Sequence, residues 1–72
     1  MGDDDSVGRD PRINPKPGDS ILSFGTCYTV TSAGEAGVEY LWHDDDDSGS
    51  GALHLTSWRR EFEHAIVLEV SP

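Results

Sequence analysis

The sequence predicts a small, mainly β fold: an SH3-like barrel of about five short strands with one short helix before the last strand. Three observations predict it. The 72 residues suffice for a single domain. From residue 20 onward, short apolar or alternating runs are separated by turn residues, which is typical of strands. Near the end, the apolar spacing changes to that of a helix. An open α+β sheet is the alternative architecture.

Five strands are expected, at residues 20–24, 26–32, 38–43, 52–55 and 66–70. Each is rich in β-branched, aromatic or other apolar residues. In the third strand, Val38, Tyr40 and Trp42 share one face, because successive side chains of a strand point to opposite faces. Residues 33–37 contain two glycines and predict a hairpin loop between the second and third strands, since glycine adopts positive φ without steric cost.

The helix is expected between the last two strands. Trp58, Phe62 and Ala65 recur at i, i+4 and i+7, the apolar stripe of a short amphipathic helix. Thr56 or Ser57 is expected to cap its N-terminus by accepting a hydrogen bond from a backbone N–H. A helix before the last of five strands is the order of an SH3-like barrel, whereas an OB-fold would place it between the third and fourth strands.

The domain organisation follows from composition. Residues 1–17 are expected to form a flexible acidic and proline-rich N-terminal tail, and residues 18–72 a single small β-barrel domain. The tail has few apolar side chains, so it cannot bury enough surface to offset the entropy of ordering. Residues 10–16 are expected to be extended, because a residue before proline is disfavoured in a helix. Residues 44–51 contain only Asp, Ser and Gly and predict a flexible loop.

The charge is strongly acidic but localised. Fourteen Asp and Glu residues stand against five Lys and Arg residues, which gives a net charge of −9. Half of the acids lie in two clusters, Asp3–Asp5 and Asp44–Asp47, and the other seven nearly balance the bases. Direct binding to nucleic acid is not expected, because this charge repels phosphate. An acidic, DNA-mimic-like antagonist of a nucleic-acid-binding protein is one alternative function.

Cysteine content and hydropathy indicate the compartment. Cys27 is the only cysteine, which is compatible with a reducing environment. No apolar run approaches 18 residues, and the N-terminus lacks the basic and apolar regions of a signal peptide. We therefore expect a cytoplasmic protein that does not bind a membrane.

Two segments carry a resemblance to known sequences. The first contains Asp10-Pro11-Arg12, Pro15 and Pro17-Gly18-Asp19. The second contains Leu55, Trp58-Arg59, Ala65 and Val67-Leu68. With Val38 and Tyr40 between them, they resemble a loose group of small uncharacterised bacterial and phage proteins. This resemblance covers residues 10–70 and implies a small β-rich domain. It implies no function, since none is known for the group.

The acidic loop also resembles part of a calcium-binding loop. Asp44, Asp46, Ser48 and Gly49 match positions 1, 3, 5 and 6 of an EF-hand, but Leu55 replaces the bidentate acid at position 12. No flanking helices are predicted either. We therefore expect no cofactor and no specific metal site. Asp44, Asp46 and Ser48 are the metal candidates of a second alternative function, a divalent-metal-responsive domain working through residues 44–51.

The sequence predicts no enzyme and no catalytic residue. It contains no phosphate-binding glycine loop and no Ser, His and Asp order typical of a hydrolase. Cys27 lies in the middle of an apolar strand, where burial makes a thiol inert. So small a core is also expected to leave no room for a pocket of about 300 Å³, which argues further against an enzyme. A small-molecule ligand is not expected.

The first expectation for function is therefore a non-enzymatic protein-interaction module. Most of the aromatic side chains are expected in the core, with Trp58 buried against the last strand near Ile66 or Leu68. Trp42, beside the acidic loop, is the better candidate for a partly exposed binding aromatic. The expected partner is another protein, with a basic protein among the candidates. The candidate partner-binding residues are Tyr40, Trp42, Asp44, Asp45, Asp46 and Asp47.

Overall fold

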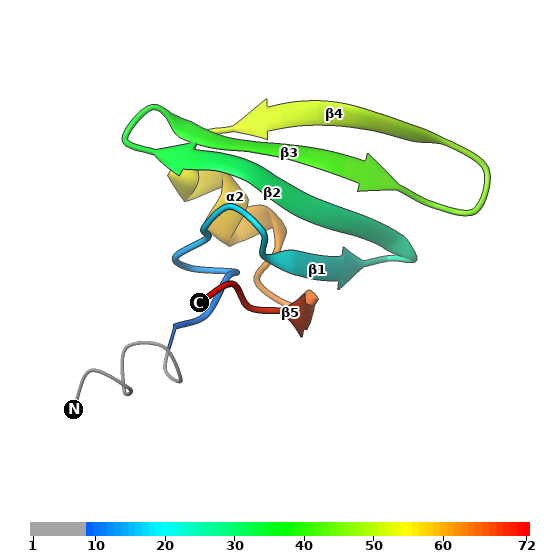
Figure 1. The fold of residues 1–72 in the computed structure, drawn as a ribbon, viewed down its shortest axis with the longest axis horizontal. Helices are drawn as coiled ribbons and strands as arrows, with labels where there is room; N and C mark the ends of the chain where they lie inside the picture. Colours follow the sequence, from blue (N-terminus) through cyan, green and yellow to red (C-terminus); the bar gives the residue numbers. More distant parts are fainter. Residues whose placement is uncertain (1–8) are drawn as a thin grey trace.

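The computed structural model describes residues 9–72 and contains one five-stranded antiparallel sheet and one short helix (Figure 1). The predicted mainly β fold, with five strands and a helix before the last of them, is confirmed. No helix of the described residues is long and apolar enough to cross a membrane. The elements are β1 (Ser20–Ser23), β2 (Thr26–Gly34), β3 (Gly37–His43), β4 (Ser48–Leu53), α2 (Leu55–Glu61) and β5 (Ile66–Glu69).

The sheet is open, and the expected closure into a barrel is absent. The strand order is β4-β3-β2-β1-β5, so β1 to β4 form a meander and β5 returns to pair with β1. β4 and β5 are the two edges and do not contact each other. β1 and β5 have four residues each, so this side of the sheet is too short to curl round to β4. The open sheet, named above as the alternative, describes the molecule.

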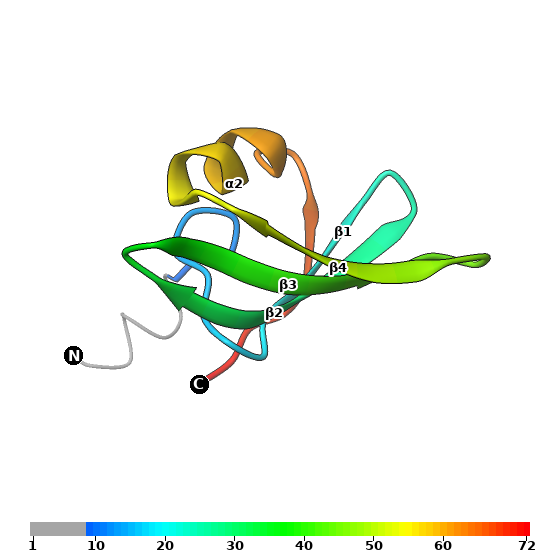
Figure 2. The same cartoon turned by 90° about the horizontal axis from the view of Figure 1, so that it is seen from above.

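The core lies between the sheet and α2, which covers one face (Figure 2). The register pairs Val30 with Tyr40 and Tyr28 with Trp42, so these side chains share that face as the alternation predicts. Three aromatic contacts connect the sheet to the helical segment. The ring centroids are 4.7 Å apart for Tyr28–Phe62, 5.7 Å for Tyr40–Trp58 and 6.5 Å for Tyr40–Phe62.

The helical segment buries Trp58 and Phe62 as predicted, but α2 ends at Glu61, so the buried Ala65 lies beyond the helix and the predicted stripe is too long. Two further details of the helix differ. Its N-cap is His54, without a side-chain hydrogen bond, so the expected cap by Thr56 or Ser57 is wrong. Both of those residues already lie inside the first turn. Trp58 is fully buried, but Ile66 and Leu68, which were expected to cover it, are exposed.

Residues 9–17, expected in the tail, pack against the helix and the C-terminal segment. Pro11 and Pro15 are buried, and the Pro11 carbonyl accepts a 2.9 Å hydrogen bond from Trp58 Nε1. Arg59 Nε donates to the carbonyl of Ile13 at 2.8 Å. Residues 10–13 form a turn instead of the expected extended segment. The folded unit therefore begins before residue 18, and residues 1–8 of the expected tail lie outside the described residues.

Asp19 joins the N-terminal and C-terminal segments. Its carboxylate is completely buried and pairs with both terminal nitrogens of Arg9, one of them at 2.9 Å. It also accepts hydrogen bonds from the backbone N–H of Lys16 at 2.7 Å and of Ser71 at 2.6 Å. Burial by itself raises the pKa of this carboxyl, but the hydrogen bonds outweigh burial, so the pKa lies below its usual value.

β4 begins at Ser48, so the expected flexible loop over residues 48–51 is wrong. Its glycines make room for the large side chains of β3. A Cβ on Gly49 would lie 2.7 Å from Trp42 Cζ2, and one on Gly51 would lie 2.7 Å from the Tyr40 hydroxyl oxygen. The rings of β3 therefore lie over the glycines of β4, a known way to stabilise glycine in a sheet. The β3–β4 hairpin extends beyond the core because of this pairing.

Candidate functional site

The four aspartates between β3 and β4 form a tight turn, which we call the acidic tip (Asp44–Asp47). The backbone N–H of Asp44 donates to the carbonyl of Asp47 at 2.9 Å. Asp44 Oδ1 in turn accepts hydrogen bonds from the N–H groups of Asp46, at 2.9 Å, and Asp47, at 2.8 Å. Asp44 thus holds the turn, and all four aspartates are exposed at the end of the hairpin farthest from α2 and both termini (Figure 1).

The hairpin that carries the tip has no compensating positive charge. Residues 37–53 contain five acids and no Lys or Arg, because all five bases of the chain lie in residues 9–16 and 59–60. The ion pairs within residues 9–72 are Arg9–Asp19, Arg12–Asp10 and His64–Glu63, and none includes a tip carboxylate. The field of the tip therefore reaches into solvent over about 8 Å at physiological salt.

The structure separates the two aromatic candidates. Tyr40 is partly buried and packs against the core cluster, where it contacts Tyr28 and Trp58, and burial raises the pKa of its hydroxyl. Trp42 is half-buried, packs over Gly49 and lies two residues before the acidic tip. A shallow hollow lies beside its ring, lined by residues 41–43 and 48–50. Trp42 and the four aspartates therefore form one surface, and Tyr40 supports it from within.

The metal candidates do not form a site. Asp44 Oδ1 already accepts two backbone hydrogen bonds, and Asp47 Oδ1 accepts one from the N–H of Ser48 at 2.8 Å. Strands, not helices, flank the turn. Across residues 9–72, no group of three or more His, Cys, Asp or Glu side chains is placed to hold a metal ion. Asp44, Asp46 and Ser48 are thus neighbours along a turn, with no converging oxygens.

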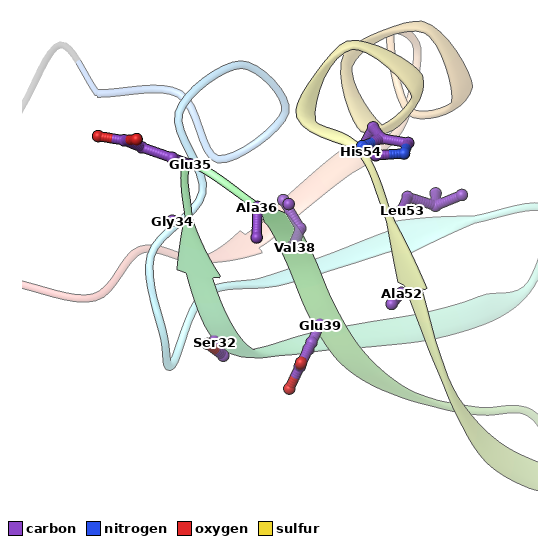
Figure 3. A pocket seen from close by; sticks show the side chains of 10 residues that line it. Ser32, Gly34, Glu35, Ala36, Val38, Glu39, Ala52, Leu53 and His54 are labelled. Carbon is purple, nitrogen blue, oxygen red and sulfur yellow. The ribbon is translucent and has the colours of Figure 1, made fainter.

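Cys27 is a half-buried free thiol in β2, paired in register with Leu22 and His43. A separate open hollow of about 390 Å³ lies at the β2–β3 turn and the end of β4 (Figure 3), so the expectation that the molecule has no room for a pocket of about 300 Å³ is wrong. Its titratable side chains are Glu35, Glu39 and His54, and Figure 3 shows the two carboxylates well apart and pointing in different directions. No titratable groups converge there, so the hollow offers no general acid and base pair.

Sequence reasoning missed two exposed apolar features. Phe24 is fully exposed in the two-residue turn between β1 and β2, with a φ of 51°. Ile66 and Leu68 are 61% and 51% exposed on β5. The turn could have been recognised from the sequence, since two residues, Phe24 and Gly25, are the usual length of a tight hairpin turn. The exposure of β5 could not have been recognised in this way, because it depends on the order of the strands in the sheet.

No protein-family model matches the chain, and comparisons with curated proteins and with solved structures find no match. The resemblance to small bacterial and phage proteins stays a prediction.

Proposed function

We propose that this protein is a non-enzymatic interaction module that binds a basic segment of a partner protein through Trp42 and the acidic tip. The observation that carries this proposal is the charge distribution: five acids and no base on a projecting hairpin. Clustered charge of one sign raises the rate of encounter with an oppositely charged partner and favours such partners over others. The proposed location is the cytoplasm.

Trp42 supplies what charge alone does not. An exposed ion pair contributes only about 0–1 kcal/mol, so four aspartates give modest and salt-sensitive affinity. An aromatic ring adds apolar contact and attracts Lys or Arg side chains placed over its face, by roughly 0.5–1 kcal/mol at exposed sites. Because Trp42 packs over Gly49, its ring is held in place before a partner arrives. Little side-chain entropy is then lost on binding.

The geometry favours this function over the two alternatives. A divalent-metal-responsive domain needs converging oxygens, whereas Asp44 directs one oxygen at the backbone of its own turn. An antagonist that imitates DNA needs carboxylates spaced along a rigid face, whereas these four lie in one turn. A short basic segment, with two to four Lys or Arg residues, matches the extent of the tip.

The test compares two variants with the same change in net charge. In the first, Asp45, Asp46 and Asp47 become Asn, while Asp44 still holds the turn. In the matched control, Glu35, Glu61 and Glu63 become Gln; these acids are exposed and lie outside the hairpin tip. Each immobilised protein is incubated with lysate at about 50 mM salt and eluted at about 300 mM, where screening is much stronger.

We expect the wild type and the control to retain the same partner and release it at the higher salt. The tip variant should retain at least about tenfold less of this partner than the wild type does. Adding Trp42→Ala to the tip variant should reduce retention further at low salt. Equal retention by the tip variant and the control would refute the proposal, because nonspecific charge would then explain binding. Retention that survives high salt would also contradict it.

A further inference from the structure

β5 is an edge strand whose apolar side chains are exposed. It pairs with β1 on one side, with a register shift that leaves Leu68 without a partner in β1, and within residues 9–72 no strand pairs with its other side. The exposed fractions are 61% for Ile66, 36% for Val67, 51% for Leu68 and 39% for Val70 just beyond it. Proteins usually protect such an edge with Lys, Pro, a β-bulge or a covering segment, and on β5 the register shift at Leu68 is such a bulge. Residues 66–70 contain neither Lys nor Pro, and Glu69 is their only charge.

Side chains from the N-terminal segment fix both ends of this strand. Before it, Arg12 Nη1 donates to the carbonyl of Ala65 at 3.1 Å. After it, the N–H of Ser71 donates to Asp19 Oδ1 at 2.6 Å, and Arg9 donates to the Ser71 carbonyl. The strand is therefore held extended at both ends, while its outer edge has no partner among residues 9–72. An edge ordered in advance loses little conformational entropy when another strand pairs with it.

We propose that β5 pairs with β5 of a second copy of this chain. The two strands run antiparallel about a two-fold axis at Leu68, which joins two five-stranded sheets into one of ten strands. This inference concerns an edge that the proposed partner surface does not use, so it stands independently of that function. Main-chain hydrogen bonds supply the pairing, as in other cases of strand addition.

The residues of β5 select the register. A two-fold axis brings one residue opposite its own copy, and a pair centred on Glu69 would place two carboxylates face to face. A pair centred on Val67 would bring Ala65 into the ladder, although the Ala65 carbonyl is already occupied by Arg12. Centring on Leu68 places Leu68 against Leu68, with Ile66 against Val70. Glu69 then lies opposite Val67, away from its copy.

Charge also favours a second copy at this edge. β4 and the hairpin that carries the acidic tip lie at the other edge of the sheet. Two copies joined at β5 therefore keep their acidic tips as far apart as the fold allows. The remaining repulsion between two chains of net charge −9 is screened by salt, so salt should strengthen the dimer. Binding of a basic partner at the tip has the opposite salt dependence.

The size of the contact sets its strength. Five residues per copy is well below the roughly 20–30 residues per side of a standard stable interface. The dimer should therefore be reversible, with a dissociation constant in the range of about 10 µM to 1 mM. Such an interface forms where the protein is concentrated.

Disulfide trapping tests the register. Cys27 is first replaced by Ser, and Leu68→Cys or Ile66→Cys is added to the full chain. Residues directly opposite in an antiparallel pair have Cα atoms about 4.5–5.5 Å apart, within the range of a disulfide. The two copies of residue 66 would be roughly 13 Å apart, which is out of reach. Under mild oxidation, we expect Leu68→Cys to form at least about fivefold more covalent dimer than the more exposed Ile66→Cys.

Sedimentation equilibrium tests association without cysteines. The wild type should self-associate between about 10 µM and 1 mM, and more strongly as salt rises. Leu68→Lys should be monomeric, whereas Ile13→Lys, at a residue 49% exposed outside the sheet, should behave as the wild type. Circular dichroism checks that both variants are folded. A monomeric wild type at 1 mM, an unaffected Leu68→Lys variant, or equal trapping at residues 66 and 68 would each overturn the proposal.

Discussion

Replacement of Trp58 tests how this small domain is held together. Trp58 is completely buried, and its ring contacts Phe62 and Tyr40, with centroids 4.5 and 5.7 Å away. Its Nε1–H donates to the buried carbonyl of Pro11 at 2.9 Å. The side chain therefore joins three parts of the chain: the N-terminal segment, β3 and the helical segment. No other residue of the core combines an aromatic contact with a hydrogen bond to residues 9–17.

Two substitutions separate packing from hydrogen bonding. Trp58→Ala removes the ring, at a cost of about 3–5 kcal/mol, and leaves the Pro11 carbonyl unpaired, which adds about 1–3 kcal/mol. A domain of this size has a total stability of roughly 3–5 kcal/mol. Trp58→Ala should therefore be largely unfolded at 25 °C. Trp58→Phe keeps an aromatic ring and should lose about 1.5–3 kcal/mol, mainly through the lost hydrogen bond and volume.

The assay is urea unfolding, followed by far-UV circular dichroism and by the fluorescence of Trp42, the tryptophan that remains. Wild type, Trp58→Phe and Trp58→Ala should rank in that order of stability, with no cooperative transition in the last. A cooperative Trp58→Ala transition with a loss below about 1.5 kcal/mol would refute the reasoning. Residues 9–17 would then be dispensable for folding, and the core would be smaller than the burial indicates.

Two further predictions concern single side chains. Because the pKa of Asp19 is lowered in the folded state, its stabilising contribution is complete above its unfolded pKa of about 3.8 and is lost as pH falls through the folded value. The urea midpoint of the wild type should therefore decrease as the pH is lowered from 5 to 2.5, and the midpoint of Asp19→Asn should decrease less. Equal decreases in the two proteins would contradict this. Phe24→Asn should stabilise the protein by about 1 kcal/mol, because Asn tolerates a φ of 51° and Asn-Gly favours a tight hairpin. A loss of stability in the same assay would mean that the Phe24 ring makes a contact worth more than its backbone strain.

The sequence predicted those elements whose apolar residues recur at the regular spacing of a strand or a helix. Val38, Tyr40 and Trp42 share a face because a strand repeats every two residues, whatever surrounds it. Trp58 and Phe62 are buried together because they lie about one helical turn apart, whereas Ala65 is buried beyond the end of α2. Likewise, the surface formed by Trp42 and the acidic tip was predictable, since its members are neighbours along the chain.

The parts that sequence did not predict depend on distant neighbours. Residues 48–51 have the composition of a loop, and they form a strand because rings of β3 occupy the space above Gly49 and Gly51. Residues 9–17 have few apolar side chains, and they are held by side chains about 45 residues away, such as Trp58 and Arg59. The exposure of β5 follows from its place at the end of the strand order. Each of these causes involves residues that are far apart in the sequence, so a short stretch of sequence does not reveal it.

The two proposals share one physical origin, which is the separation of the sheet's edges. One edge ends in negative charge and the other in apolar side chains, so each edge can bind without disturbing the other. In a ten-stranded dimer, nine strand spacings would place the two β4 edges about 43 Å apart. A partner with two basic segments could then bind both tips at once. Its affinity for the dimer would exceed its affinity for one tip, because the second segment binds at a high effective concentration once the first is bound. Leu68→Lys should therefore weaken binding of such a partner although Leu68 lies far from either tip, whereas a partner with one basic segment should be unaffected.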